Sequence, residues 1–148
     1  MSLKDQLLED IKQAMRAGDK ARLVTLRMAS AAIKQREVDE RIEADDSVVL
    51  ATLEKMIKQR RESAEQYRAG QRPDLAATEE AEIALLQPYL PEPLSEEALC
   101  RLIDQAIAES GASGMADMGK VMGRIKTQAQ GRADMGRVSS LVRARLAG

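Results

Sequence analysis

Apolar residues recur every three or four positions along most of the chain. This period places them on one face of an α-helix, whereas a β-strand needs alternation at every second residue, and no stretch shows it. Gly and Pro residues interrupt the pattern and mark the ends of the expected helices. The sequence therefore predicts an all-α fold.

Four helices are expected in the first part of the chain. The first has apolar positions at intervals of four and ends at Gly18, with Leu3, Leu7, Ile11 and Met15 as its inward face. The second has Leu23, Leu26, Ser30 and Ile33 inward, before a loop from Val38 to Asp46. The third runs up to Gly70 with the stripe Leu50, Leu53, Ile57, Ala64 and Tyr67, and the fourth carries Leu75, Glu79, Ile83 and Leu86.

Three of the four prolines, Pro88, Pro91 and Pro93, lie within six residues of one another. Proline fixes φ and has no N–H, so a cluster of prolines ends a helix and favours extended chain. We therefore expect residues 87–94 to form a stiff extended connector. It separates an N-terminal helical module, residues 1–90, from a C-terminal basic helical module, residues 91–148.

The C-terminal module is expected to contain three helices. Ser95 is a suitable N-cap for the first, which ends at Gly111, and Gly131 and Asp134 stand between the other two. The apolar stripes are Leu99, Ile103 and Ile107; Met118, Val121, Met122 and Ile125; and Met135, Val138, Val142 and Leu146.

The composition excludes many kinds of active site. The chain has no His, so His-based acid–base pairs, Ser-His and Cys-His nucleophiles and the common zinc ligand sets are excluded. Residues 114–121 come close to a phosphate-binding loop, but Val121 replaces the hydroxyl that must hold magnesium and no strand precedes the glycines. We predict no catalytic residue, no metal site and no cofactor.

Cys100 is the single cysteine and cannot form an internal disulfide. Its apolar neighbours favour a buried side chain, with a reactive thiol as the alternative. One cysteine suits a reducing compartment, and apolar runs are too short for a signal peptide or a membrane span. We therefore expect a cytoplasmic protein without membrane contact.

Charge is segregated along the chain although the total is only −1. Residues 71–100 carry a net charge of −6 and residues 118–148 a net charge of +6. A basic segment points to a polyanionic partner, although the same segment could dock on the acidic one. Residues 118–148 contain no aromatic side chain on which bases could stack, so folded RNA fits better than single strands.

Several ordered motifs resemble one family, the YqeY-like proteins. They are residues 26–34, residues 58–67, Arg72-Pro73-Asp74-Leu75, Glu79-Glu80-Ala81-Glu82, Tyr89-Leu90-Pro91, residues 118–123 and residues 131–134. The family is related to the C-terminal tail of the B subunit of the glutamyl/aspartyl-tRNA amidotransferase, which the C-terminal module resembles. The chain has Asp134-Met135 where that tail has Asn-Pro, so the match is to the stand-alone family, and the acid could weaken a nearby phosphate contact.

The resemblance implies a two-part helical fold that contacts tRNA through its last helices. We expect a tRNA-binding or tRNA-associated adaptor, non-catalytic alone, whose RNA-binding residues are Gly119, Lys120, Gly123, Arg124, Lys126, Gly131, Arg132 and Arg137. One alternative is a protein–protein module that docks on an aminoacyl-tRNA synthetase or an amidotransferase. Another is an accessory part of a carbon–nitrogen ligase with glutamine as amido-N-donor, the activity that the family name suggests.

Overall fold

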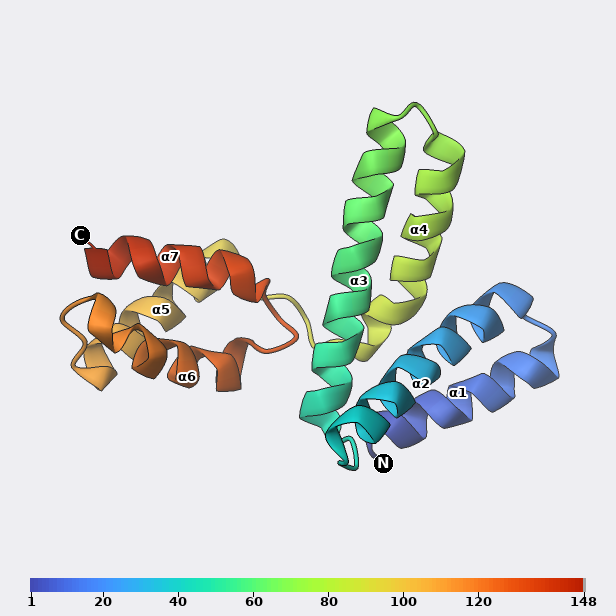
Figure 1. The fold of residues 1–148 in the computed structure, drawn as a ribbon, viewed down its shortest axis with the longest axis horizontal. Helices are drawn as coiled ribbons and strands as arrows, with labels where there is room; N and C mark the ends of the chain where they lie inside the picture. The colour runs from blue at the N-terminus through green and yellow to red at the C-terminus, as the bar shows by residue number, and fades with distance from the viewer. Residues whose placement is uncertain (148) are drawn as a thin grey trace. The chain divides into compact units, whose positions relative to one another are not determined.

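A computed structural model describes residues 1–147, which form helices and no strand, so the all-α prediction is confirmed. The chain divides into two compact units, Met1–Leu90 and Pro91–Gly148 (Figure 1). Each unit has its own apolar core, and the two cores share no residue. We call them unit 1 and unit 2.

Unit 1 consists of two antiparallel helical hairpins. Helices α1 (Leu3–Ala17) and α2 (Lys20–Glu40) form the first, and α3 (Asp46–Ala69) and α4 (Pro73–Leu86) form the second (Figure 1). Their inward faces meet in one core, which includes Leu7, Leu26, Ile33, Leu53, Ile57 and Leu86. The sequence marks the helix starts locally, because Ser2, Asp19 and Asp45 each accept a hydrogen bond from a backbone N–H of the following turn.

Two expectations for the first hairpin were wrong in detail. Met15 is 54% exposed, and Ala14 is fully buried in its place. An interval of four residues drifts by about 40° per step on a helix, so Leu7 shares its face with Ala14 rather than with Met15. Helix α2 also continues beyond Val38, because pairs four residues apart, Gln35 with Asp39 and Arg36 with Glu40, support its last turn.

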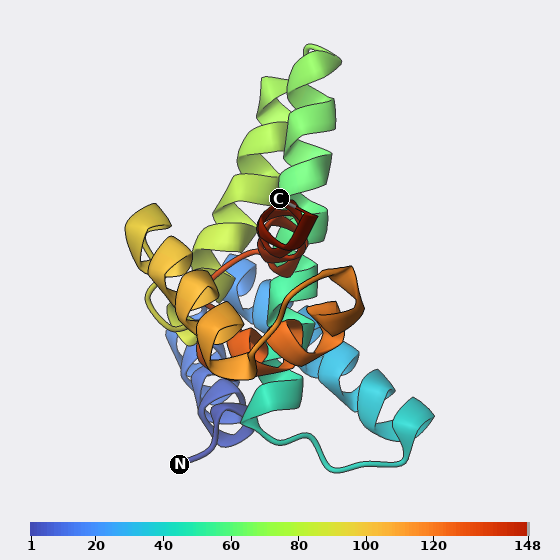
Figure 2. The same ribbon diagram turned by 90° about the vertical axis from the view of Figure 1, so that its left-hand side faces the viewer.

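Glu37 ties the loop between α2 and α3, seen along the bottom of Figure 2, to the helices. Its carboxylate accepts the N–H of Ala44 at 2.8 Å and the ammonium of Lys4 at 2.7 Å. These two hydrogen bonds, the one from Lys4 foremost, hold the pKa of Glu37 below its usual value. The ionised form is therefore the one that unit 1 stabilises.

The connector is shorter than predicted. Gln87–Tyr89 form a 3₁₀ turn, and the N–H of Leu90 donates to the carbonyl of Gln87 at 3.0 Å. The φ that Pro88 imposes is compatible with such a turn, and its missing N–H is not needed in a first turn. The Tyr89 hydroxyl donates to the Asp10 carboxylate, and burial together with that carboxylate raises the pKa of Tyr89 above its usual range.

Unit 2 consists of α5 (Glu96–Ser110), a 3₁₀ turn (Met115–Asp117), α6 (Met118–Ala129) and α7 (Met135–Ala147). The predicted stripes meet in the second core, whose largest members are Leu99, Ile103, Val121, Ile125, Val138 and Val142. Ser95 caps α5 and Gly111 ends it in the left-handed conformation, as expected. Cys100 is free and only partly buried.

We expect Leu53→Ala and Ile125→Ala each to lower the free energy of unfolding of its own unit by about 2–5 kcal/mol, because each leaves a cavity in a packed core. Amide hydrogen exchange followed by mass spectrometry locates the effect. Leu53→Ala should accelerate exchange in α1–α4 and Ile125→Ala in α5–α7. Faster exchange throughout the chain from either variant would contradict the independence of the cores.

We also expect unit 1 to lose stability in acid as Glu37 becomes protonated. A lowered pKa means that the carboxylate stabilises the fold above its unfolded pKa, and that this contribution disappears as the pH falls through the folded value. Glu37→Gln should therefore flatten the acid limb of stability against pH, measured by thermal melting. An unchanged acid limb would show that Glu37 does not contribute.

Candidate nucleic-acid interface

The outward face of α6 is set by the residues that α6 buries. Val121, Ile125 and Ala129 are fully buried at intervals of four. Gly119 and Gly123 lie on the opposite face and are exposed. A Cβ built at either glycine would meet no atom within 4 Å, so no other segment of the described chain packs against them. The two glycines leave a strip of helix backbone open to solvent, which we call the glycine strip.

Three exposed cations flank the glycine strip. At about 100° per residue, Lys120 and Arg124 fall on one side of it and Lys126 on the other. Lys120 and Lys126 form no ion pair within residues 1–147. Arg124 forms an ion pair with Glu109 at 3.4 Å, and both of these side chains are exposed. Five predicted RNA-binding residues, Gly119, Lys120, Gly123, Arg124 and Lys126, thus share one face of one helix.

Arg132 and Gly131 lie elsewhere, in the turn between α6 and α7. The Arg132 side chain donates to the carbonyl of Glu92 at 2.9 Å, and its own carbonyl accepts the N–H of Leu94 at 2.8 Å. Gly131 is buried with φ of 78°, a conformation that favours glycine. Arg132 therefore holds the start of unit 2 against the α6–α7 turn, and Gly131 supplies the left-handed conformation within that turn.

Two of the three arginines of α7 pair with acids of α5. Arg137 forms an ion pair with Glu96, and Arg145 forms one with Asp104 at 2.6 Å. The hydrogen bond that the Arg137 guanidinium donates to the Glu96 carboxylate raises the pKa of Arg137, so that guanidinium keeps its charge. Unit 2 as a whole carries eight bases and seven acids. The positive charge of residues 118–148 is therefore partly offset by ion pairs in space, whereas Lys120 and Lys126 on the face of α6 have no ion pair among the described residues, as is also true of Arg101 and Arg143.

Sequence reasoning missed Thr127, which lies four residues after Gly123 and continues the glycine strip. Its hydroxyl donates to the carbonyl of Arg124 at 2.9 Å and so is turned back onto the helix. The spacing of residues 119, 123 and 127 was the available signal. A helix face is recognised by three such positions more securely than by two.

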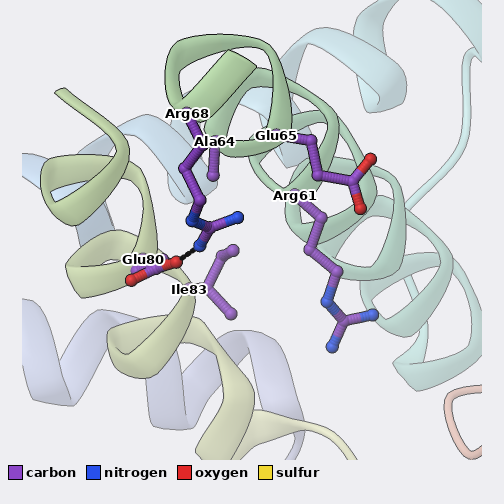
Figure 3. Close-up of a pocket in the computed structure, with 6 residues that line it drawn as sticks. All are labelled: Arg61, Ala64, Glu65, Arg68, Glu80 and Ile83. Atoms are coloured by element: carbon purple, nitrogen blue, oxygen red, sulfur yellow. Dashed lines mark ion pairs between the residues drawn. The ribbon is translucent and has the colours of Figure 1, made fainter. Parts of the chain in front are cut away.

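Unit 1 has a cavity of about 290 Å³ between α3 and α4. It is a weaker candidate for a binding site than the face of α6. It is lined by Arg61, Ala64, Glu65, Arg68, Glu80 and Ile83 (Figure 3). Arg68 forms an ion pair with Glu80, and Arg61 reaches Gln87 at 3.5 Å. Two acids thus balance the two arginines of the lining, and no thiol or hydroxyl is among its residues. The cavity offers neither a strong anion site nor a nucleophile.

No helix among residues 1–147 is both long enough and apolar enough to span a bilayer. No group of three or more Cys, Asp and Glu side chains there could hold a metal ion.

The fold and this face define a two-unit helical protein with a basic, glycine-lined helix. Residues 4–146 match the family model described as Yqey-like protein, so the chain belongs to that family and the resemblance found in the sequence is confirmed. The match spans both units.

The curated relatives are described as "Altered inheritance of mitochondria protein 41, mitochondrial". The relative from Vanderwaltozyma polyspora is 38% identical over 57% of this chain and 46% of its own length. The relative from Pyrenophora tritici-repentis is 32% identical over 81% of this chain and 67% of its own length. The relative from Saccharomyces cerevisiae is 28% identical over 78% of this chain and 66% of its own length. The chain therefore spans about half to two thirds of the relatives that it matches.

These relatives are named as mitochondrial proteins, which contradicts our expectation of a cytoplasmic protein. The expectation was wrong because it rested on composition and on the single cysteine. A reduced thiol is compatible with any reducing compartment, so it does not select the cytoplasm.

We expect Gly123→Ala to stabilise unit 2 by about 0.5–1 kcal/mol, because Gly123 lies inside α6, alanine has the higher helix propensity, and the added methyl meets no atom within 4 Å. Thermal or denaturant unfolding measures the change. Gly111→Ala is the matched control and should destabilise, since Gly111 has φ of 69°. Destabilisation by Gly123→Ala would show that the glycine serves the fold itself.

Proposed function

We propose that this chain is a tRNA-binding or tRNA-associated adaptor, non-catalytic by itself, that contacts RNA with the outward face of α6. The observation that carries the proposal is the glycine strip with its flanking cations. Gly123 lies inside α6 and weakens it by about 0.5–1 kcal/mol relative to alanine, and a Cβ at Gly119 or Gly123 would meet no atom within 4 Å, so packing gives no reason for either glycine. Such a strip is understandable if a ligand approaches the helix backbone closely.

The chemistry of the strip favours a polyanion. Lys120 and Lys126 have no carboxylate partner among the described residues and can neutralise phosphates on the two sides of the strip. Arg124 can exchange its exposed contact with Glu109 for a phosphate, since an exposed ion pair contributes at most about 1 kcal/mol. A phosphate backbone lying along the strip would meet all three cations.

The absence of aromatic side chains narrows the class of nucleic acid. The only aromatic residues of the chain are Tyr67 and Tyr89, both in unit 1. Proteins that bind single strands stack bases on aromatic rings, whereas folded RNA is recognised by its shape, phosphates and 2′-hydroxyls. We therefore propose structured RNA, and tRNA in particular because the family resembles the tail of a tRNA-dependent amidotransferase subunit.

The partner protein is proposed on the same resemblance. A small adaptor that holds tRNA would hand it to an amidotransferase or an aminoacyl-tRNA synthetase. The hypothesis of a carbon–nitrogen ligase accessory part stays a prediction, since the α6 face bears on binding and not on amide transfer.

We expect the double variant Lys120→Gln with Lys126→Gln to weaken binding of labelled bulk tRNA, measured by fluorescence anisotropy of the full chain across a salt series. Three phosphate contacts give a slope of log affinity against log salt of roughly −2 to −3. Losing two of them should bring the slope close to −1. A flat salt response of the wild-type chain would contradict the proposal.

Two matched variants test whether binding depends on the place of the bases on α6 or only on the net charge of the protein. Arg101→Gln removes an exposed base from α5 and should leave the affinity nearly unchanged. Gly123→Gln adds a side chain to the strip without changing the net charge, at a position where a Cβ meets no atom within 4 Å, and should weaken binding. Equal losses from Arg101→Gln and from the lysine variants would indicate nonspecific attraction and not a face on α6.

A further inference from the structure

Helix α2 has a second apolar face, on the side away from the core of unit 1. Its inward face buries Leu26, Ala29 and Ile33. On the outward face, intervals of four and three residues alternate through a row that we call the outer seam, which consists of Val24, Met28, Ala31, Gln35 and Val38. This alternation is the heptad spacing by which two helices pack along a common seam.

The outer seam is exposed although most of it is apolar. Val24 is 56% exposed, Met28 42% and Val38 60%. Single exposed apolar side chains are ordinary on protein surfaces, but a contiguous row with a helical repeat marks an interaction site. The small Ala31 in the middle of the row allows close approach of a second helix, and Gln35 is the kind of polar seam residue that fixes register.

A row of bases runs beside the outer seam with a period of seven. We call Lys20, Arg27 and Lys34 the basic row. Within residues 1–147 none of the three forms an ion pair, and the Arg27 guanidinium lies 3.7 Å from the sulfur of the exposed Met15. In a helix pair this flanking position faces the flanking residues of the partner, where charge decides which partner is accepted.

We propose that the outer seam binds an amphipathic helix of a partner protein whose apolar stripe is flanked by acidic residues. The partner's stripe would cover Val24, Met28 and Val38, and its carboxylates would pair with the basic row. The outer seam and the basic row both lie in unit 1, so binding of a partner helix there is independent of RNA binding by α6.

Charge also disfavours a second copy of the chain as the occupant. Two α2 helices packed antiparallel would place one basic row against the other. Packed parallel, the basic row would face Ala32 and Asp39, which supply one acid for three bases. A lipid surface fits less well than a helix, because Gln35 interrupts the seam and no Trp, Phe or Leu is part of it.

A designed peptide of about four heptads, with Leu along its seam and Glu at the flanking positions, tests the proposal. It is labelled and titrated with the full chain, and binding is followed by fluorescence anisotropy. We expect the Glu peptide to bind at least about tenfold more tightly than the same peptide with Lys at the flanking positions. Equal affinity of the two peptides, or no binding of the Glu peptide, would overturn the proposal.

Variants place the binding on α2. Val24→Ser with Val38→Ser should weaken binding of the Glu peptide about tenfold or more, and both positions are exposed, so the fold should persist. The matched control Met115→Ser changes an exposed apolar side chain of unit 2 and should have no effect. Arg27→Glu with Lys34→Glu should reverse the preference between the two peptides. An unreversed preference would overturn the assignment to the basic row.

Two other measurements address the competing occupants. Sedimentation equilibrium of the chain alone should give a monomer, and a dimer abolished by Val24→Ser with Val38→Ser would assign the seam to a second copy. Vesicles of phosphatidylcholine and phosphatidylserine should not bind through the seam. Vesicle binding lost in the same variant would assign it to a membrane and overturn the proposal.

Discussion

The burial of Val121, Ile125 and Ala129 fixes the rotation of α6, and the candidate interface depends on it. A helix that buries one stripe must present the opposite one, and here the opposite stripe contains Gly119 and Gly123. The α5 acids act on the same surface indirectly. By pairing with Arg137 and Arg145 of α7 they reduce the free positive charge elsewhere in unit 2, while Lys120 and Lys126 on the outward face of α6 have no ion pair among the described residues.

The two units follow the same principle with different chemistry. In each unit, one helix packs one face into the core. Packing accounts for the residues of that face but not for the residues of the opposite, outward face. On α6 that face is bare backbone flanked by lysines, which suits phosphates. On α2 it is an apolar seam beside a row of bases, which suits a helix with acidic flanks. An adaptor needs two such faces, one for RNA and one for protein.

The apolar period and the capping residues were sufficient to predict the helices, because both act within a few residues of the chain. Failures arose where the outcome depends on tertiary packing or on small angular differences. Met15 was placed inward by strict fourfold spacing that a helix does not keep, and Pro88 was assigned to extended chain although its φ also fits a 3₁₀ turn. The glycine strip of α6 was visible in the sequence. The pairing of Arg137 with Glu96 was not, since it depends on how α7 lies against α5.

The most direct test of the account is an amide NMR spectrum of the ¹⁵N-labelled full chain, recorded with and without folded tRNA. Glycine amides are well separated in such spectra, and Gly119 and Gly123 report from the centre of the strip. We expect these two and Lys120 to shift or broaden first, with Arg101 on α5 little changed. Perturbation confined to unit 1, or to the outward face of α7, would contradict the assignment of RNA binding to α6.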